Sequence, residues 1–229
     1  MSAYPVHFSA DYQEKRNRLT VFFRLILAIP LIVVLMVYGI LAEIAIVIAW
    51  FAIVFTARYP AGLFEFVAGF TRALTRITGY AALMADDYPP FWGEPDDAYP
   101  VRLNFDGPLP EYSRVKTFFR LILAIPLLII RYAFGIVLEI VAIGAWFVIL
   151  FTGKLPRGLF DALAYSNSYI ARADSYVFLL TESYPSLDEK DAVEQADGSL
   201  SAPGSTATLA APVQEPLREP TDGGGAAAD

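Results

Sequence analysis

The sequence predicts an all-α membrane protein built from two tandem modules, and three observations carry this prediction. The chain is 56% hydrophobic and only 18% charged, which is more apolar and less charged than a typical soluble domain. Two long apolar stretches occur, at Leu19–Phe55 and Val115–Phe151. The ten residues FFRLILAIPL stand without a difference at Phe22–Leu31 and Phe118–Leu127, so the two stretches are copies of each other.

The duplication extends over most of the chain. A shift of 96 residues aligns the halves without a gap from about Phe22 to Pro89. We therefore divide the chain into a first membrane module (1–92), a second membrane module (93–185) and a tail (186–229). Each module opens with a Tyr-Pro-Val segment in which apolar and polar residues alternate, and this alternation predicts a short strand.

The charge is unevenly placed along the chain. The formal net charge is −7, and the acidic residues after Ser186 account for all of it, so the body is neutral. The tail is rich in Ala, Gly, Pro, Ser and acids, and we expect it to be disordered. The chain has no cysteine and one histidine, which excludes disulfides and argues against histidine-based metal sites.

The length of each apolar stretch predicts a fold-back. A single helix of 37 residues would be about 55 Å long, nearly twice the roughly 30 Å hydrocarbon core of a bilayer. We therefore predict a transmembrane hairpin in each module, with turns at Gly39 and Gly135. Each arm is only about 22 Å long between its charged residues, so a re-entrant hairpin that stays in one leaflet is the alternative.

Basic residues before and after each apolar stretch predict the orientation. Under the positive-inside rule both ends of each hairpin, and both termini, face the cytoplasm from a multi-pass position in the plasma membrane. The modules would then be parallel copies about a pseudo-two-fold axis along the membrane normal.

A second helix is predicted after each hairpin, and in the first module it covers residues 61–84. Glu65, Arg72 and Arg76 fall on one face of it and apolar residues cover much of the rest. We expect an amphipathic helix in the cytoplasmic interface, and a third embedded helix whose polar stripe faces protein is the alternative.

Both modules carry the same order of short motifs. Tyr-Pro-Val is followed by Phe-Arg-Leu-Ile-Leu-Ala-Ile-Pro, by an Ala-Trp-Phe to Gly-Leu-Phe stretch, and by Tyr-Pro. This order, over residues 4–185, resembles a bacterial membrane family known only as a domain of unknown function. The resemblance implies a small multi-pass membrane protein, commonly with two such modules, and it supplies no catalytic residues.

Five charged residues inside the apolar stretches are the candidate site residues. Arg24 and Arg120 either snorkel to phosphates from a helix start, or bind an anionic lipid head group or a buried partner. Glu43 and Glu139 lie near the far interface if the turns are at the glycines, and a proton or ion relay is the alternative. Arg131 stands at a height in the predicted hairpin that allows an ion pair with Glu139.

The sequence shows no phosphate-binding loop, dinucleotide fingerprint, nucleophile elbow or zinc-protease motif. We expect a non-enzymatic scaffold or accessory protein of the membrane, self-associating or bound to another membrane protein. We expect no cofactor, no metal and no nucleic-acid partner. A small transporter or channel component that uses the interface between the repeats is the alternative.

Overall fold

A computed structural model describes residues 4–187, so that nearly all of the predicted tail lies outside the described residues. The first copy contains β1 (Val6–Ala10), α1 (Arg18–Phe22), α2 (Arg24–Thr56) and α3 (Ala61–Ala81). The second copy repeats this order with β2 (Val101–Phe105), α4 (Arg114–Phe118), α5 (Arg120–Thr152) and α6 (Arg157–Val177). Each helix of the second copy begins and ends 96 residues after its counterpart, which confirms the predicted duplication.

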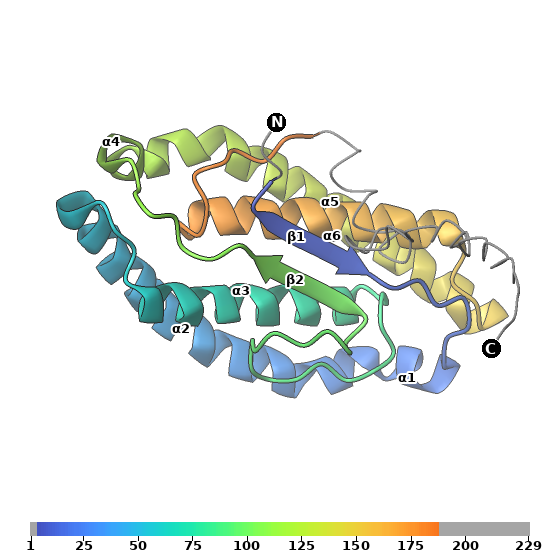
Figure 1. The fold of residues 1–229 in the computed structure, drawn as a ribbon. Helices are drawn as coiled ribbons and strands as arrows, with labels where there is room; N and C mark the ends of the chain where they lie inside the picture. The colour runs from blue at the N-terminus through green and yellow to red at the C-terminus, as the bar shows by residue number, and fades with distance from the viewer. Residues whose placement is uncertain (1–3, 188–229) are drawn as a thin grey trace, which may run out of the picture.

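The elements form three layers (Figure 1). An antiparallel ribbon of β1 and β2 lies on the paired central helices α3 and α6, with β2 packed on α3 and β1 on α6. The long helices α2 and α5 pack against α3 and α6, respectively, away from the ribbon.

The predicted short strands are confirmed, and the ribbon joins the two copies. Phe8 stands opposite Leu103 at the centre of its register. Val6, Phe8 and Ala10 are buried against the central helices, while the residues between them face outward. The alternation of apolar and polar residues therefore gives the ribbon one apolar face and one polar face.

The prediction of a fold-back at Gly39 and Gly135 is wrong, because α2 and α5 are each continuous over 33 residues. Both glycines lie inside a helix. A glycine in a helix interior costs only about 1 kcal/mol relative to alanine, so an otherwise strongly helical segment continues through it.

The chain reverses later, after the end of each long helix. Ala57 and Gly153 adopt the left-handed conformation that ends a helix, with φ of 58° and 73°. Pro60 and Pro156 then precede the first turns of α3 and α6. Each copy is therefore a hairpin of a long and a shorter helix, and the two ends of each long helix lie about 50 Å apart.

The second helix of each copy lies at the centre of the molecule, where protein covers most of its surface. Its polar stripe faces protein, as in the alternative interpretation. The Arg72 guanidinium lies 5.2 Å from the centre of the Phe105 ring in β2, and the Arg76 side chain is also buried. The ribbon thus covers a stripe that sequence periodicity alone assigns to solvent.

The two copies are interlocked at both ends of the long helices. Trp50 Nε1 of α2 donates to the carbonyl oxygen of Thr117 in α4 at 2.9 Å. Its counterpart Trp146 Nε1 of α5 donates to the carbonyl oxygen of Val21 in α1 at 3.2 Å. The short helix of each copy therefore packs on the long helix of the other copy.

The long helices cover their outer faces with apolar side chains. α2 carries fifteen exposed large apolar residues between Leu25 and Phe55, and α5 carries thirteen between Leu121 and Phe151. Both helices are long and apolar enough to cross a membrane, and only 17% of the most apolar window of each is buried by protein. The core helix of a soluble protein would instead be mostly covered.

Candidate functional site

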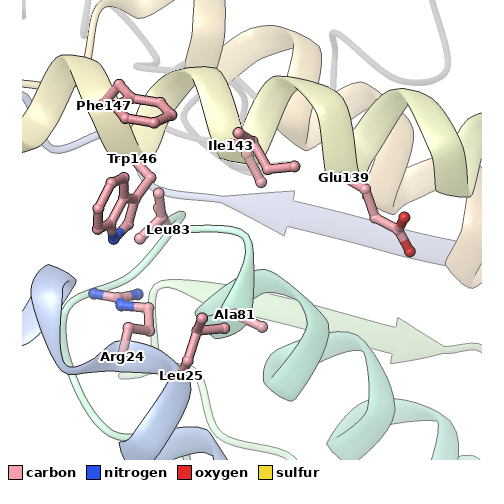
Figure 2. A pocket seen from close by; sticks show the side chains of 9 residues that line it. Arg24, Leu25, Ala81, Leu83, Glu139, Ile143, Trp146 and Phe147 are labelled. Atoms are coloured by element: carbon pink, nitrogen blue, oxygen red, sulfur yellow. The ribbon is translucent and has the colours of Figure 1, made fainter.

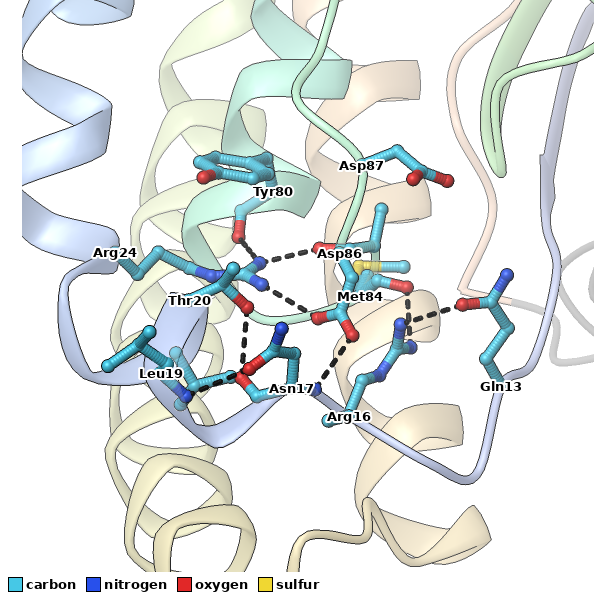
Figure 3. Close-up of polar contacts among 12 residues, drawn as sticks. Gln13, Arg16, Asn17, Leu19, Thr20, Arg24, Tyr80, Met84, Asp86 and Asp87 are labelled. Carbon is cyan, nitrogen blue, oxygen red and sulfur yellow. Dashed lines mark hydrogen bonds and ion pairs between the residues drawn. The ribbon is translucent and has the colours of Figure 1, made fainter.

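Arg24 ties the start of α2 to the loop that follows α3 (Figure 3). Its side chain is 2% exposed, and Nη1 donates to the carbonyl oxygens of Tyr80 at 2.5 Å and Ala85 at 2.6 Å. Nη2 bonds to Asp86 Oδ1 at 2.9 Å, and the guanidinium lies 4.4 Å from the centre of the Tyr80 ring. Hydrogen bonds to charged groups contribute about 1.5–3 kcal/mol each, so these contacts hold the start of α2 firmly against the loop after α3. We call this cluster of Arg24, Tyr80, Ala85 and Asp86 the first arginine corner.

Asp86 extends the corner to the segment before α1. Its second oxygen, Oδ2, accepts a hydrogen bond from the backbone N–H of Asn17 at 3.0 Å (Figure 3). The Asn17 side chain in turn caps α1 by accepting from the N–H of Leu19. Arg16 Nη2 donates to the Met84 carbonyl oxygen at 2.7 Å, and burial lowers the pKa of the Arg16 guanidinium while the Asp86 carboxylate opposes that shift.

The second copy builds the same corner around Arg120. Its Nε donates to the Tyr176 carbonyl oxygen at 2.7 Å, its Nη2 donates to the Thr181 carbonyl oxygen, and its guanidinium lies 3.7 Å from the Tyr176 ring centre. Glu182 stands at the position equivalent to Asp86, and its Oε1 accepts a hydrogen bond from the backbone N–H of Ser113 at 2.6 Å.

These contacts explain why the arginine is repeated. The loops after α3 and α6 turn sharply at Leu83 and Leu179, whose φ values of 66° and 67° are unfavourable for a leucine. Arg24 and Arg120 bind the carbonyl groups that these turns expose. The structure therefore directs both candidate arginines into the protein, where their terminal nitrogens bond to the chain itself.

Arg131 has a different partner from the one predicted. It makes a two-pronged ion pair with Asp174 of α6, with Nη2 at 3.0 Å from Oδ2, so the predicted pair with Glu139 is wrong. Because α5 does not fold back at Gly135, the two side chains do not meet across a hairpin. The first copy carries Leu35 and Thr78 at the equivalent places of the ion pair.

Two equivalent apolar grooves separate the long helices. The first has a volume of about 560 Å³ and runs between the start of α2 and the second half of α5 (Figure 2). The second, of about 340 Å³, runs between the start of α5 and the second half of α2. This crossed pairing shows that α2 and α5 run antiparallel. The lining residues of the first groove include Arg24, Leu25, Ile143, Trp146 and Phe147.

Glu43 and Glu139 are exposed on the long helices. Glu139 lines the first groove, with its carboxylate turned into the space below α5 (Figure 2). The grooves are otherwise apolar apart from arginines that are already bonded. Such a lining suits an acyl chain better than a polar reactant. Among residues 4–187, no three His, Cys, Asp or Glu side chains converge on a position for a metal ion.

Sequence reasoning missed the acids that complete the arginine corners. Asp86 and Asp87 form an acidic pair of the kind that is typical of a solvated loop. The Asp86 carboxylate nevertheless bridges Arg24 and the backbone N–H of Asn17. A signal was present in the repeat, because an acid follows the arginine by 62 residues in both copies, at Asp86 and Glu182. The hydrogen bonds of the two tryptophans to α4 and α1 leave no such signal, since their acceptors are backbone groups.

The comparisons with known proteins agree with this two-copy architecture. No curated protein and no solved structure matches the chain. One family model matches twice, at residues 18–93 and 114–187, which together cover most of the chain and correspond to the two copies. The chain therefore belongs to the family described as "Domain of unknown function (DUF4389)" and contains two copies of its domain.

Proposed function

We propose that this protein is a non-catalytic membrane protein that holds α2 and α5 in lipid. The exposed apolar faces of these helices carry the proposal. Fully burying one large apolar side chain contributes about 1.5–3 kcal/mol, and the outward side chains of α2 and α5 are roughly half exposed. Leaving 28 of them in water would therefore cost on the order of 20–40 kcal/mol, more than a domain's whole stability.

The use of the repeated residues supports a structural role over catalysis. Arg24 and Arg120 hold loops, Trp50 and Trp146 join the copies, and Asp86 bridges two segments. The side chains most clearly shared by the two copies thus serve packing. We propose a scaffold or accessory role in the plasma membrane, with self-association or a membrane-protein partner as its mode of action.

A small transporter remains the competing function, with Glu43 and Glu139 lining a path. Arg24 and Arg120, the other charged side chains near the grooves, are bonded to internal carbonyl groups, which favours the scaffold. Ion or solute flux through liposomes that contain the protein, and that disappears in the Glu43→Gln/Glu139→Gln variant, would overturn the scaffold proposal.

Vesicle flotation tests the lipid contact directly. The full chain is mixed at pH 8 with vesicles of phosphatidylcholine and phosphatidylglycerol and centrifuged through a density gradient. The wild-type protein is expected to float with the lipid. The variant Ile40→Asp/Ile44→Asp places two carboxylates on the outer face of α2, each costing about 2.5–3.5 kcal/mol in hydrocarbon, and lowers the partition constant by roughly 10⁴.

The matched control carries the same two charges on the polar side of the molecule. Ala98→Asp/Asn104→Asp changes exposed residues of the loop and ribbon, and it is expected to float like the wild type. Circular dichroism is recorded for both variants to check that they are folded. Wild-type protein that stays at the bottom of the gradient would contradict the proposal.

A further inference from the structure

The shape and polarity of the molecule bear on how it would sit in a membrane. We infer that α2 and α5 lie parallel to the membrane surface within one leaflet, with the ribbon of β1 and β2 in water. The inference rests on the proposed lipid contact and adds its geometry. Four observations carry it: the length of the apolar faces, the polarity of the ribbon, the placement of basic residues and the symmetry of the copies.

The apolar faces are too long for a spanning arrangement. Each long helix has 33 residues, or about 50 Å, and exposes apolar side chains along its whole length. A bilayer core is about 30 Å thick. To fit within it, each helix would need a tilt of about 53°, outside the usual range of 0–40°. A helix that lies in the leaflet has no such mismatch.

The ribbon excludes hydrocarbon from its side of the molecule. It runs along the middle of the central helices, since Val101 packs by Gly79 and Phe105 packs by Arg72. If the long helices stood upright, the ribbon would lie at mid-membrane with its outer face in lipid. The residues on that face are polar or charged: His7, Ser9, Arg102 and Asn104. At the strand ends Asp11 bonds to Arg102 and Asp106 bonds to His7.

The edges of the ribbon lead to the same conclusion. Within residues 4–187 the sheet has only two strands, so each strand has one edge that no third strand of this part of the chain pairs with. Open sheet edges do not occur in contact with lipid tails, because nothing there can satisfy their N–H and C=O groups. The ribbon therefore belongs in water, on the side opposite the long helices.

Basic residues stand at both ends of the long helices, which suits one leaflet and not two. Lys15 of the first copy forms an isolated backbone β-bridge with Lys154 of the second, so the basic residues of one end come from both copies. The Lys154 ammonium pairs with the Glu14 carboxylate at 2.7 Å, whereas Lys15 and Arg18 are exposed at the same end. At the other end the backbone N–H of Tyr112 donates to the Ala57 carbonyl oxygen at 2.9 Å, so the segments that carry Arg58 and Arg114 meet at this end. An upright helix would place these two clusters on opposite membrane faces, against the positive-inside rule. A flat helix places both clusters at the anionic head groups of one surface.

The symmetry of the molecule fits this orientation. α2 and α5 are antiparallel, as are β1 and β2, so the pseudo-two-fold axis runs through the layers, perpendicular to the helices. With the helices flat, this axis coincides with the membrane normal, and both copies meet the lipid at equal depth. The cytoplasmic leaflet, which is the anionic one, is the surface that the basic clusters match.

Spin labels at single cysteines measure this depth, and the chain has no native cysteine to interfere. Labels at Ile26→Cys, Ile40→Cys and Phe51→Cys sample the outer face of α2 over about 37 Å. The protein is reconstituted in phosphatidylcholine and phosphatidylglycerol vesicles. Collision rates with oxygen and with a water-soluble nickel chelate give the depth of each label. A fourth label, at Asn104→Cys, reports on the ribbon.

In a flat orientation the three α2 labels lie at the same depth, to within about one helix diameter of 10 Å. The nickel chelate then also reaches the label at Asn104→Cys. An upright orientation would instead place the label at residue 40 deepest, the labels at residues 26 and 51 near the two surfaces, and the label at residue 104 out of reach of the chelate. That result would overturn the flat orientation but leave the lipid contact intact. Nickel access at all three α2 positions overturns both. The equivalent labels on α5, at Ile122, Ile136 and Phe147, repeat the test if an α2 variant fails to fold.

Discussion

Replacing Arg131 by leucine removes the partner of a carboxylate that is almost fully buried. The Asp174 side chain is 5% exposed and the Arg131 side chain 35%. Removing one partner from a fully buried ion pair costs about 3–5 kcal/mol. Because solvent screens part of the Arg131 charge, we expect Arg131→Leu to destabilise the fold by about 2–3 kcal/mol. For a protein of this size, that lowers the unfolding temperature by roughly 4–12 °C.

The first copy supplies the compensating change. It carries Leu35 and Thr78 at the positions where the second copy has the ion pair. The double variant Arg131→Leu/Asp174→Thr restores these two uncharged side chains, and we expect its stability to lie within about 1 kcal/mol of the wild type. Thermal unfolding in lipid nanodiscs, followed by circular dichroism, compares the three proteins at pH 7.5.

The pH dependence gives a second readout. Burial raises the pKa of the Asp174 carboxyl, and the pairing with Arg131 opposes this rise. In Arg131→Leu only the burial remains, so the folded-state pKa moves further above the unfolded value of about 3.9. The folded state then binds more protons than the unfolded state, and stability falls as the pH rises through this window. The deficit of Arg131→Leu should therefore shrink from pH 7.5 to pH 4.5. A single variant as stable as the wild type at pH 7.5, or a double variant no more stable than the single variant, would show that Arg131 does not stabilise the buried Asp174 carboxylate.

Two further predictions concern glycines. In Gly93→Ala the new Cβ would lie 1.6 Å from the carbonyl oxygen of Gly69 in α3, so the loop that carries residue 93 must move away from α3. We expect the fluorescence spectrum of the adjacent Trp92 to shift. An unchanged spectrum would contradict this close approach. Gly39→Ala and Gly135→Ala fall inside helices, where a new Cβ would lie 3.5 Å from the Phe70 ring at position 39 and would meet nothing within 4 Å at position 135. We expect each change to leave the unfolding temperature unchanged or to raise it by the equivalent of up to about 1 kcal/mol, whereas a turn at either position would make the change destabilising.

Sequence periodicity and repetition predicted the two copies, the short strands and the long apolar segments. They place the reversal of the chain wrongly, because a glycine near the middle of a 37-residue apolar stretch resembles a turn between two membrane-length helices. The actual turns carry stronger signals, with Gly153 at a helix end and with Pro60 and Pro156 just before the next helix. The thickness of a bilayer limits the length of a spanning helix, but it does not limit a helix that lies in the membrane plane.

The surroundings of the charged residues could not be predicted in the same way. Arg24 bonds chiefly to backbone carbonyl groups, which every residue has, so no residue type marks its partners. The polar stripe of α3 is amphipathic in the sequence, but the ribbon that covers it comes from residues about 30 positions later. Only Asp86 and Glu182, at a constant offset from their arginines, left a trace that repeat analysis can detect.

The behaviour of the purified full chain without detergent tests the central claim, that lipid is the solvent of the outer faces of α2 and α5. Sedimentation velocity in plain buffer, beside the same protein in phospholipid nanodiscs, is the measurement. We expect aggregation in buffer and a single discrete species in the nanodiscs. A stable, monodisperse monomer in buffer would contradict it.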